Sequence, residues 1–173
     1  SSMVMQVDEM LEEKWGGELA TYLRDDGLVQ AAWSRKTISP DGYTLSDLSM
    51  TSLTRSAVKT PVHHQMPAIK LSEGSYWGLD LTQHDGVMVL AGYHRDISTG
   101  GSWQDITSIF TLTSSTPDSP ASWSSPNIVV SDIDIRPSQG DALSIVLGQE
   151  NLHILYQEIR DDVTGIDRVG LMY

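Results

Sequence analysis

Residues 77–95, WGLDLTQHDGVMVLAGYHR, decide the fold. Two runs of strand-forming residues flank the pair Asp85-Gly86. Such a pair is a strong hairpin signal, because glycine readily adopts the positive φ that a type I′ turn requires. Similar stretches lie on either side along the chain, at residues 18–35 (ELATYLRDDGLVQAAWSR) and 141–158 (DALSIVLGQENLHILYQE). The sequence therefore predicts three β-hairpins.

The likeness between the three stretches continues beyond the hairpins. The aromatics Trp33, Tyr93 and Tyr156 end the second runs and lie 60 and 63 residues apart. A polar loop and a third apolar run follow each aromatic, and fourth runs follow at 68–71 and 128–130. The third unit has no fourth run, but a short strand-like run, VMQV at 4–7, precedes the first unit. This pattern predicts an all-β propeller in which one strand is exchanged between the two ends.

The chain is interpreted as a single β-propeller domain, residues 1–173, with four-stranded blades at 17–72, 76–132 and 141–173 plus an N-terminal strand at 3–8. Natural propellers have about four to eight blades. We therefore expect the three blades to be completed to six by a homodimer or by a missing part of the chain. In the homodimer, Val4, Met5, Gln6 and Val7 would finish the partner's last blade. The alternative is a β-sandwich of hairpins.

Residues 115–126, STPDSPASWSSP, place Ser115, Asp118 and Trp123 in order between the third and fourth runs of the second unit. This segment resembles the repeats of sialidase-like, Asp-box propellers, in which the same loop reads Ser-x-Asp-x-Gly-x-Thr-Trp. Here the spacing is one residue longer and the glycine is absent. The resemblance implies the propeller fold. It also implies an alternative function, a fragment of a divergent sialidase-like glycoside hydrolase, a family that binds the substrate carboxylate with three arginines.

Two arginines occupy matching places in this pattern. Arg35 and Arg95 each lie two residues after a hairpin aromatic, whereas the third unit has Glu158 there. One hypothesis is that they bind a ligand. The alternative is that they pair across neighbouring strands with Asp47 and Asp105.

Aromatic and acidic residues gather in the connections expected at one end of the blades. Glycan-binding proteins stack sugars on exposed aromatic rings, although packing between blades is the alternative role for such rings. An acidic residue also follows each fourth strand, and a ring of such residues would repel itself unless it shared a cation or a basic group. The candidate ligand-binding residues are Trp15, Tyr43, Trp77, Trp103, Asp8, Glu73, Asp132, Arg35 and Arg95.

Composition excludes several classes of function. A formal net charge of −12 disfavours nucleic acids and membrane surfaces as partners. The chain has no cysteine, and the adjacent His63 and His64 would point to opposite faces of an extended segment, so we expect no metal site and no cofactor.

The sequence thus favours a non-enzymatic binding module for a glycan or a protein ligand, located outside the cell or at its surface. No catalytic residue is assigned, because nothing singles out a catalytic pair among 23 acidic residues. The alternatives are the hydrolase fragment and a structural repeat of a large surface protein.

Overall fold

The computed structural model describes residues 19–38, 44–53, 74–96, 107–133, 143–148, 151–161 and 167–172. Within these ranges every regular element is a β-strand except one short 3₁₀ helix, η2 (Pro120–Ser122), and all paired strands are antiparallel. The predicted all-β class is therefore confirmed. The predicted strands at 4–7 and 68–71 lie outside the described residues, whereas the run at 128–130 lies within a strand.

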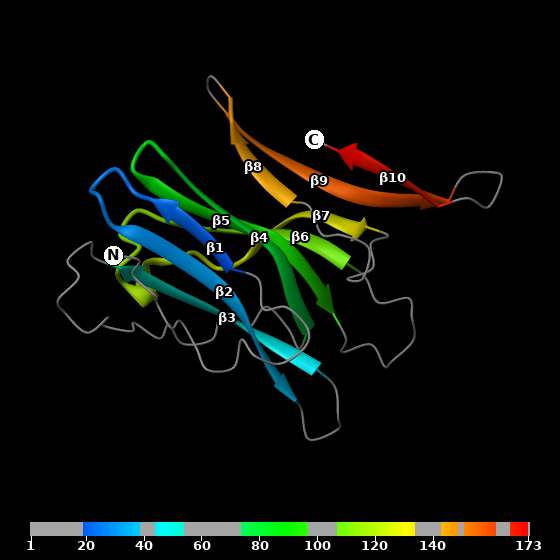
Figure 1. Cartoon of the computed structure of the whole chain (residues 1–173), viewed down its shortest axis with the longest axis horizontal. Helices are drawn as coiled ribbons and strands as arrows, with labels where there is room; N and C mark the ends of the chain where they lie inside the picture. The colour runs from blue at the N-terminus through cyan, green and yellow to red at the C-terminus, as the bar shows by residue number, and fades with distance from the viewer. Residues whose placement is uncertain are drawn as a thin grey trace, which may run out of the picture.

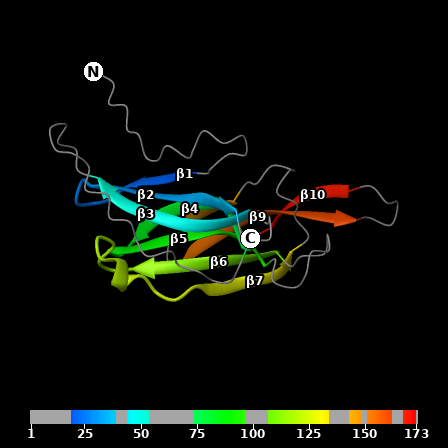
Figure 2. The ribbon, with the colours of Figure 1, turned by 90° about the horizontal axis from the view of Figure 1, so that it is seen from below.

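The strands form three open sheets, which we number along the chain (Figure 1). Sheet 1 contains β1 (Leu19–Leu23), β2 (Val29–Ile38) and β3 (Thr44–Leu53). Sheet 2 contains β4 (Gly74–His84), β5 (Val87–Asp96), β6 (Thr107–Ser114) and β7 (Asn127–Ile133), which lie in this order in Figure 2. Sheet 3 contains β8 (Leu143–Leu147), β9 (Leu152–Asp161) and β10 (Asp167–Met172), with β9 in the middle.

The hairpins β1–β2, β4–β5 and β8–β9 lie where the sequence predicts them. Asp85 and Gly86 have φ angles of 48° and 77°, as a two-residue turn with both central residues left-handed requires. The other two turns are longer. In these, Arg24 N donates to Leu28 O at 2.8 Å and Gly148 N donates to Asn151 O at 2.8 Å.

Sheet 2 lies between the other two sheets and is buried on both faces. Side chains alternate along β5, so that Met88 and Leu90 point to sheet 1 while Val89 and Ala91 point to sheet 3. The cluster between sheets 1 and 2 contains Ala20, Ala32, Leu48, Met50, Tyr76, Leu81, Met88, Leu90, Phe110, Leu112 and Trp123. The clusters between sheets 2 and 3 contain Trp77, Tyr93, Ile109, Ile133, Val89, Ala91 and Ile145, with Leu143, Leu152, Ile154 and Tyr156 packed against them.

The three sheets stack in the same sense. The pair that closes the hairpin turn is His84–Val87 in sheet 2 and Gly148–Asn151 in sheet 3. One and three pairs beyond it, Met88 and Leu90 point from sheet 2 to sheet 1. At the same positions, Leu152 and Ile154 point from sheet 3 to sheet 2. Matching ladder positions put side chains on the same side of a hairpin, because the residues share one chirality. The side of each sheet that carries the residues at these odd-numbered positions is called its back, and the opposite side is called its front. In both interfaces the front of one sheet packs on the back of the next.

A β-bulge in β4 changes one part of the predicted alignment. The pairing shifts between Trp77 and Asp80, where Gly78 has a φ of +60°. Counted from the turns, Trp33 and Tyr156 occupy the same ladder position, but the matching residue in sheet 2 is Gly92 rather than Tyr93. Leu79 fills that place, since its Cδ2 lies 2.7 Å from where a Cβ on Gly92 would stand.

Candidate functional site

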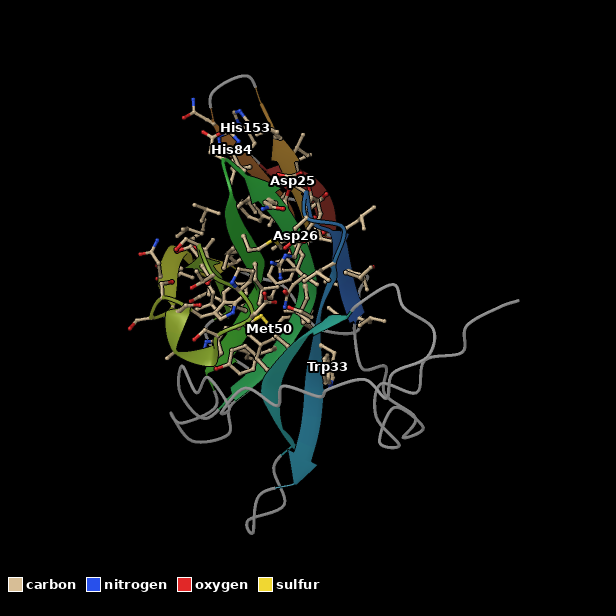
Figure 3. All side chains as sticks on the ribbon, turned by 90° about the vertical axis from the view of Figure 1, so that its left-hand side faces the viewer. Asp25, Asp26, Trp33, Met50, His84 and His153 are labelled. Atoms are coloured by element: carbon tan, nitrogen blue, oxygen red, sulfur yellow. The ribbon has the colours of Figure 1, made fainter. Side chains whose placement is uncertain are left out.

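The hairpin turns of all three sheets lie at one end of the molecule, which we call the turn end. In Figure 3, Asp25, Asp26, His84 and His153 are grouped there. The backbone N of Asp25 donates to Gln83 Oε1 at 3.0 Å, which joins the turns of sheets 1 and 2. At the opposite end, the loop end, β2, β5 and β9 finish and β3, β6 and β10 begin.

A buried arginine connects sheets 1 and 2 at the turn end. The guanidinium of Arg24 is 8% exposed and donates to Asp118 Oδ1 at 2.6 Å, to Asp26 Oδ2 at 2.5 Å and to Ser52 Oγ at 3.2 Å. Ser52 Oγ in turn donates to Gln30 Oε1 at 2.7 Å. Asp118 comes from the β6–β7 loop, so this ion pair fixes that loop of sheet 2 against the first hairpin.

The neighbouring carboxylates further favour the charged form of Arg24. Burial lowers the pKa of the guanidinium, but the hydrogen bond and charge of Asp118, followed by those of Asp26, outweigh burial and raise it. A cation with a raised folded-state pKa stabilises the fold at every pH below its ordinary pKa, and this contribution is lost only as the pH rises through the raised value. The ion pair therefore persists over the physiological range. Its free energy is modest, because Asp118 and Asp26 remain about half exposed.

The segment that resembles an Asp box forms a compact loop between β6 and β7. Trp123 is 7% exposed within the core between sheets 1 and 2, and its Nε1 donates to Pro117 O at 3.3 Å. Ser122 Oγ donates to Thr116 O at 2.5 Å and also lies near Ser119 O and Ser114 Oγ. Asp118 and Trp123 thus hold the loop to the core.

An aspartate connects sheets 2 and 3. The half-buried Asp80 in β4 accepts hydrogen bonds from Ile145 N at 2.7 Å and from Ser144 Oγ at 3.2 Å, both in β8. Its other oxygen accepts from Leu81 N at 2.9 Å. Asp80 therefore satisfies a backbone donor of β8 on the side away from β9.

Trp77, one of the predicted ligand-binding aromatics, lies in the packing between sheets 2 and 3. It is 6% exposed and stacks on Tyr93, with ring centroids 5.6 Å apart and planes 24° apart. Ile109 and Ile133 complete the cluster on sheet 2, and residues of sheet 3 cover it. This placement is the packing role that the sequence left as the alternative, and it leaves little of the ring open to a ligand.

Arg95 and Asp132 lie near Trp77 at the loop end. Arg95 is half-buried near the end of β5, opposite Thr107 rather than the predicted Asp105, which is outside the described residues. Asp132 is exposed in a bulge near the end of β7, with a φ of +59°. Asp tolerates this left-handed conformation better than most residues. The structure thus brings three of the predicted site residues to one end of sheet 2.

The structure says less about the remaining candidate ligand-binding residues. Arg35 lies opposite Asp47 in the β2–β3 ladder, the register that cross-strand pairing requires. The other candidates, Trp15, Tyr43, Trp103, Asp8 and Glu73, lie outside the described residues.

Sequence reasoning missed Arg24 and Asp80, whose side chains each make a hydrogen bond from one sheet to the next. Arg24 stands at the start of a predicted turn, and Asp80 is an acidic residue inside a strand-like run, which is a signal for a buried polar contact. Neither signal identifies the partner, which lies 94 residues away for Arg24 and 65 for Asp80.

The described residues contain no group of three or more His, Cys, Asp or Glu side chains placed to hold a metal ion. Nor do they include a helix with the length and hydropathy needed to cross a bilayer. No protein-family model matches the chain, and no curated protein matches it significantly in sequence.

Proposed function

We propose that each sheet is a blade of a β-propeller and that the loop end of the blades binds a glycan without catalysis. The observation that carries this proposal is the stacking in one sense. Front-to-back packing of successive sheets is how propeller blades are arranged around an axis, and it brings equivalent ends of the blades to one face. A two-sheet sandwich has no need of a third sheet placed in the same sense.

The loop end supplies the polar and aromatic groups that sugar binding uses. Asp132 is exposed there, and Arg95 is half-buried on the same sheet. In sequence, Tyr43 lies between β2 and β3 and Trp103 between β5 and β6, two connections that join strands at this end. Carboxylates and guanidinium groups bind sugar hydroxyls, and aromatic rings stack on sugar rings.

A glycan array and a fluorogenic glycoside screen test the proposal together. We expect saturable glycan binding and no turnover. Turnover would assign the chain to a sialidase-like hydrolase instead. A chain that binds no glycan would contradict the proposal and favour a protein ligand or a structural role.

A matched pair of variants tests whether the ligand binds at the loop end. Asp132 and Asp85 are both exposed aspartates with positive φ, one at each end of sheet 2. We expect Asp132→Asn to weaken glycan binding about tenfold, the loss of one charge-assisted hydrogen bond. Asp85→Asn is the control and should leave the affinity unchanged. Equal effects of the two variants would place the ligand elsewhere.

A further inference from the structure

Asp132 stands at a place in β7 where the strand departs from regular pairing. The pairing of β6 with β7 shifts between Thr107 and Ile109, where β7 has one residue more than β6. Within this bulge Asp132 has a φ of +59°. Asp85 shares that left-handed conformation, but it lies in a hairpin turn that requires it, whereas Asp132 lies inside a strand. The turn chemistry that accounts for Asp85 therefore does not account for Asp132.

The bulge allows two apolar side chains of β7 to pack on the same side of sheet 2. Val130 and Ile133 are three residues apart, and both belong to the cluster around Trp77 and Tyr93. In a regular strand, residues three apart point to opposite faces. The extra residue brings Ile133 back to the side of Val130, and the burial of Ile133 fixes the backbone next to Asp132. Packing thus explains the conformation at position 132, which glycine would adopt without steric cost.

The packing of β7 does not require an aspartate at this position. The side chain of Asp132 is exposed, and it makes no hydrogen bond or ion pair within the part of the chain that the structure describes. By contrast, Asp80 accepts hydrogen bonds on both of its oxygens, and Asp118 binds the guanidinium of Arg24. An ionised carboxylate is purely an acceptor. On a backbone fixed by buried neighbours, the two oxygens of Asp132 are prearranged to accept hydrogen bonds from a ligand.

We infer that Asp132 selects sugars with free hydroxyl groups on two adjacent ring carbons, each hydroxyl donating to one carboxylate oxygen. This inference rests on the proposed function and names the chemical group that the loop end recognises. Two oxygens on one carbon suit a pair of neighbouring hydroxyls, and hydrogen bonds to a charged acceptor are stronger than those between neutral groups. A site built on such bonds discriminates against an analogue that lacks one of the hydroxyls.

A double-mutant cycle between the side chain and the sugar tests the inference. The probes are the methyl glycosides of mannose, galactose and glucose with their monodeoxy analogues, used as competitors of glycan binding. For wild type, removing either of two adjacent hydroxyls should weaken binding about tenfold, the loss of one charge-assisted hydrogen bond. Asp132→Gly, which suits the positive φ, should bind the parent glycoside at least about tenfold more weakly, and its deoxy analogues should bind no worse than the parent.

Two further variants keep the result interpretable. Asp132→Asn retains one acceptor oxygen, so it should remain sensitive to only one of the two hydroxyls. Asp85→Gly, at the turn end, is the control and should reproduce the wild-type pattern, and thermal unfolding should give all three variants the Tm of wild type.

The function and the inference can fail separately. A wild-type chain that binds glycans, with Asp132→Gly showing the same sensitivity to each hydroxyl, would overturn the inference and leave the proposed function standing. A wild-type chain that binds no glycan would overturn both.

Discussion

Two buried tryptophans, Trp33 and Trp77, have indole N–H groups without an acceptor among the described residues. An unsatisfied buried donor costs about 1–3 kcal/mol, so the burial of these rings must contribute more than that. For Trp77 the contribution comes from stacking on Tyr93 and from contact with the residues of sheet 3. Trp33 is as well buried as Trp77, at 7% against 6% exposed, but it lies on the side of sheet 1 that faces away from sheet 2 (Figure 3).

Substitutions at Trp77 separate a core residue from a ligand contact. Trp77→Ala should lower the free energy of unfolding by about 3–5 kcal/mol, because it leaves a cavity between the sheets. Trp77→Phe should cost less than about 1.5 kcal/mol, since it keeps an aromatic ring and removes the unsatisfied N–H. Urea unfolding measures both values. A Trp77→Ala variant that stays as stable as wild type but loses glycan binding would show that the ring contacts ligand.

The hairpin elements could be predicted from the sequence because their determinants are local. Asp85 and Gly86 are adjacent in the chain, and their positive φ angles form the turn without help from other elements. The bulge at Gly78 could not be predicted, because its extra residue is accommodated by Gly92 on the neighbouring strand. The hairpin aromatics therefore seemed to align when Tyr93 in fact lies one position further along its ladder.

The candidate site shows the same division between local and long-range information. Trp77, Arg95 and Asp132 lie near one end of sheet 2, but whether they bind a ligand stays a prediction. The exposure of each side chain depends on which sheet covers it. The cluster that buries Trp77 is covered by residues of sheet 3 such as Tyr156, far along the chain, and no pattern around Trp77 indicates this packing.

The contact between β4 and β8 gives a prediction about these elements. Asp80→Ala removes the acceptor of Ile145 N, so the free energy of unfolding should fall by about 1–2 kcal/mol. Amide hydrogen exchange at Ile145 should become about tenfold faster as sheet 3 separates more readily from sheet 2. Ser144→Ala is the control, because it removes only the 3.2 Å bond and should cost less than about 0.5 kcal/mol. Unchanged exchange at Ile145 in Asp80→Ala would contradict this role.

In the molecule as a whole, sheet 2 is the element on which the other two depend. Sheet 1 is joined to it by an apolar core and the Arg24–Asp118 ion pair, and sheet 3 by a second apolar interface and Asp80. The polar contacts account for little of the stability and mainly fix how each sheet is placed on the next. The apolar interfaces account for most of the stability, because the buried area lies there.

The charge of the whole molecule predicts the class of glycan. The net charge is −12, and Asp132 at the loop end is exposed. Such a surface repels anionic sugars, and added salt screens the repulsion. We therefore expect neutral glycans to bind with an affinity that barely changes with salt. Sialylated and sulfated glycans should bind more weakly and improve as salt is added. Arrays probed at low and high ionic strength measure both trends. A sialidase-like site predicts the reverse order, because its arginines bind the sugar carboxylate, so tight binding of sialylated glycans at low salt would favour the hydrolase over the neutral-glycan module.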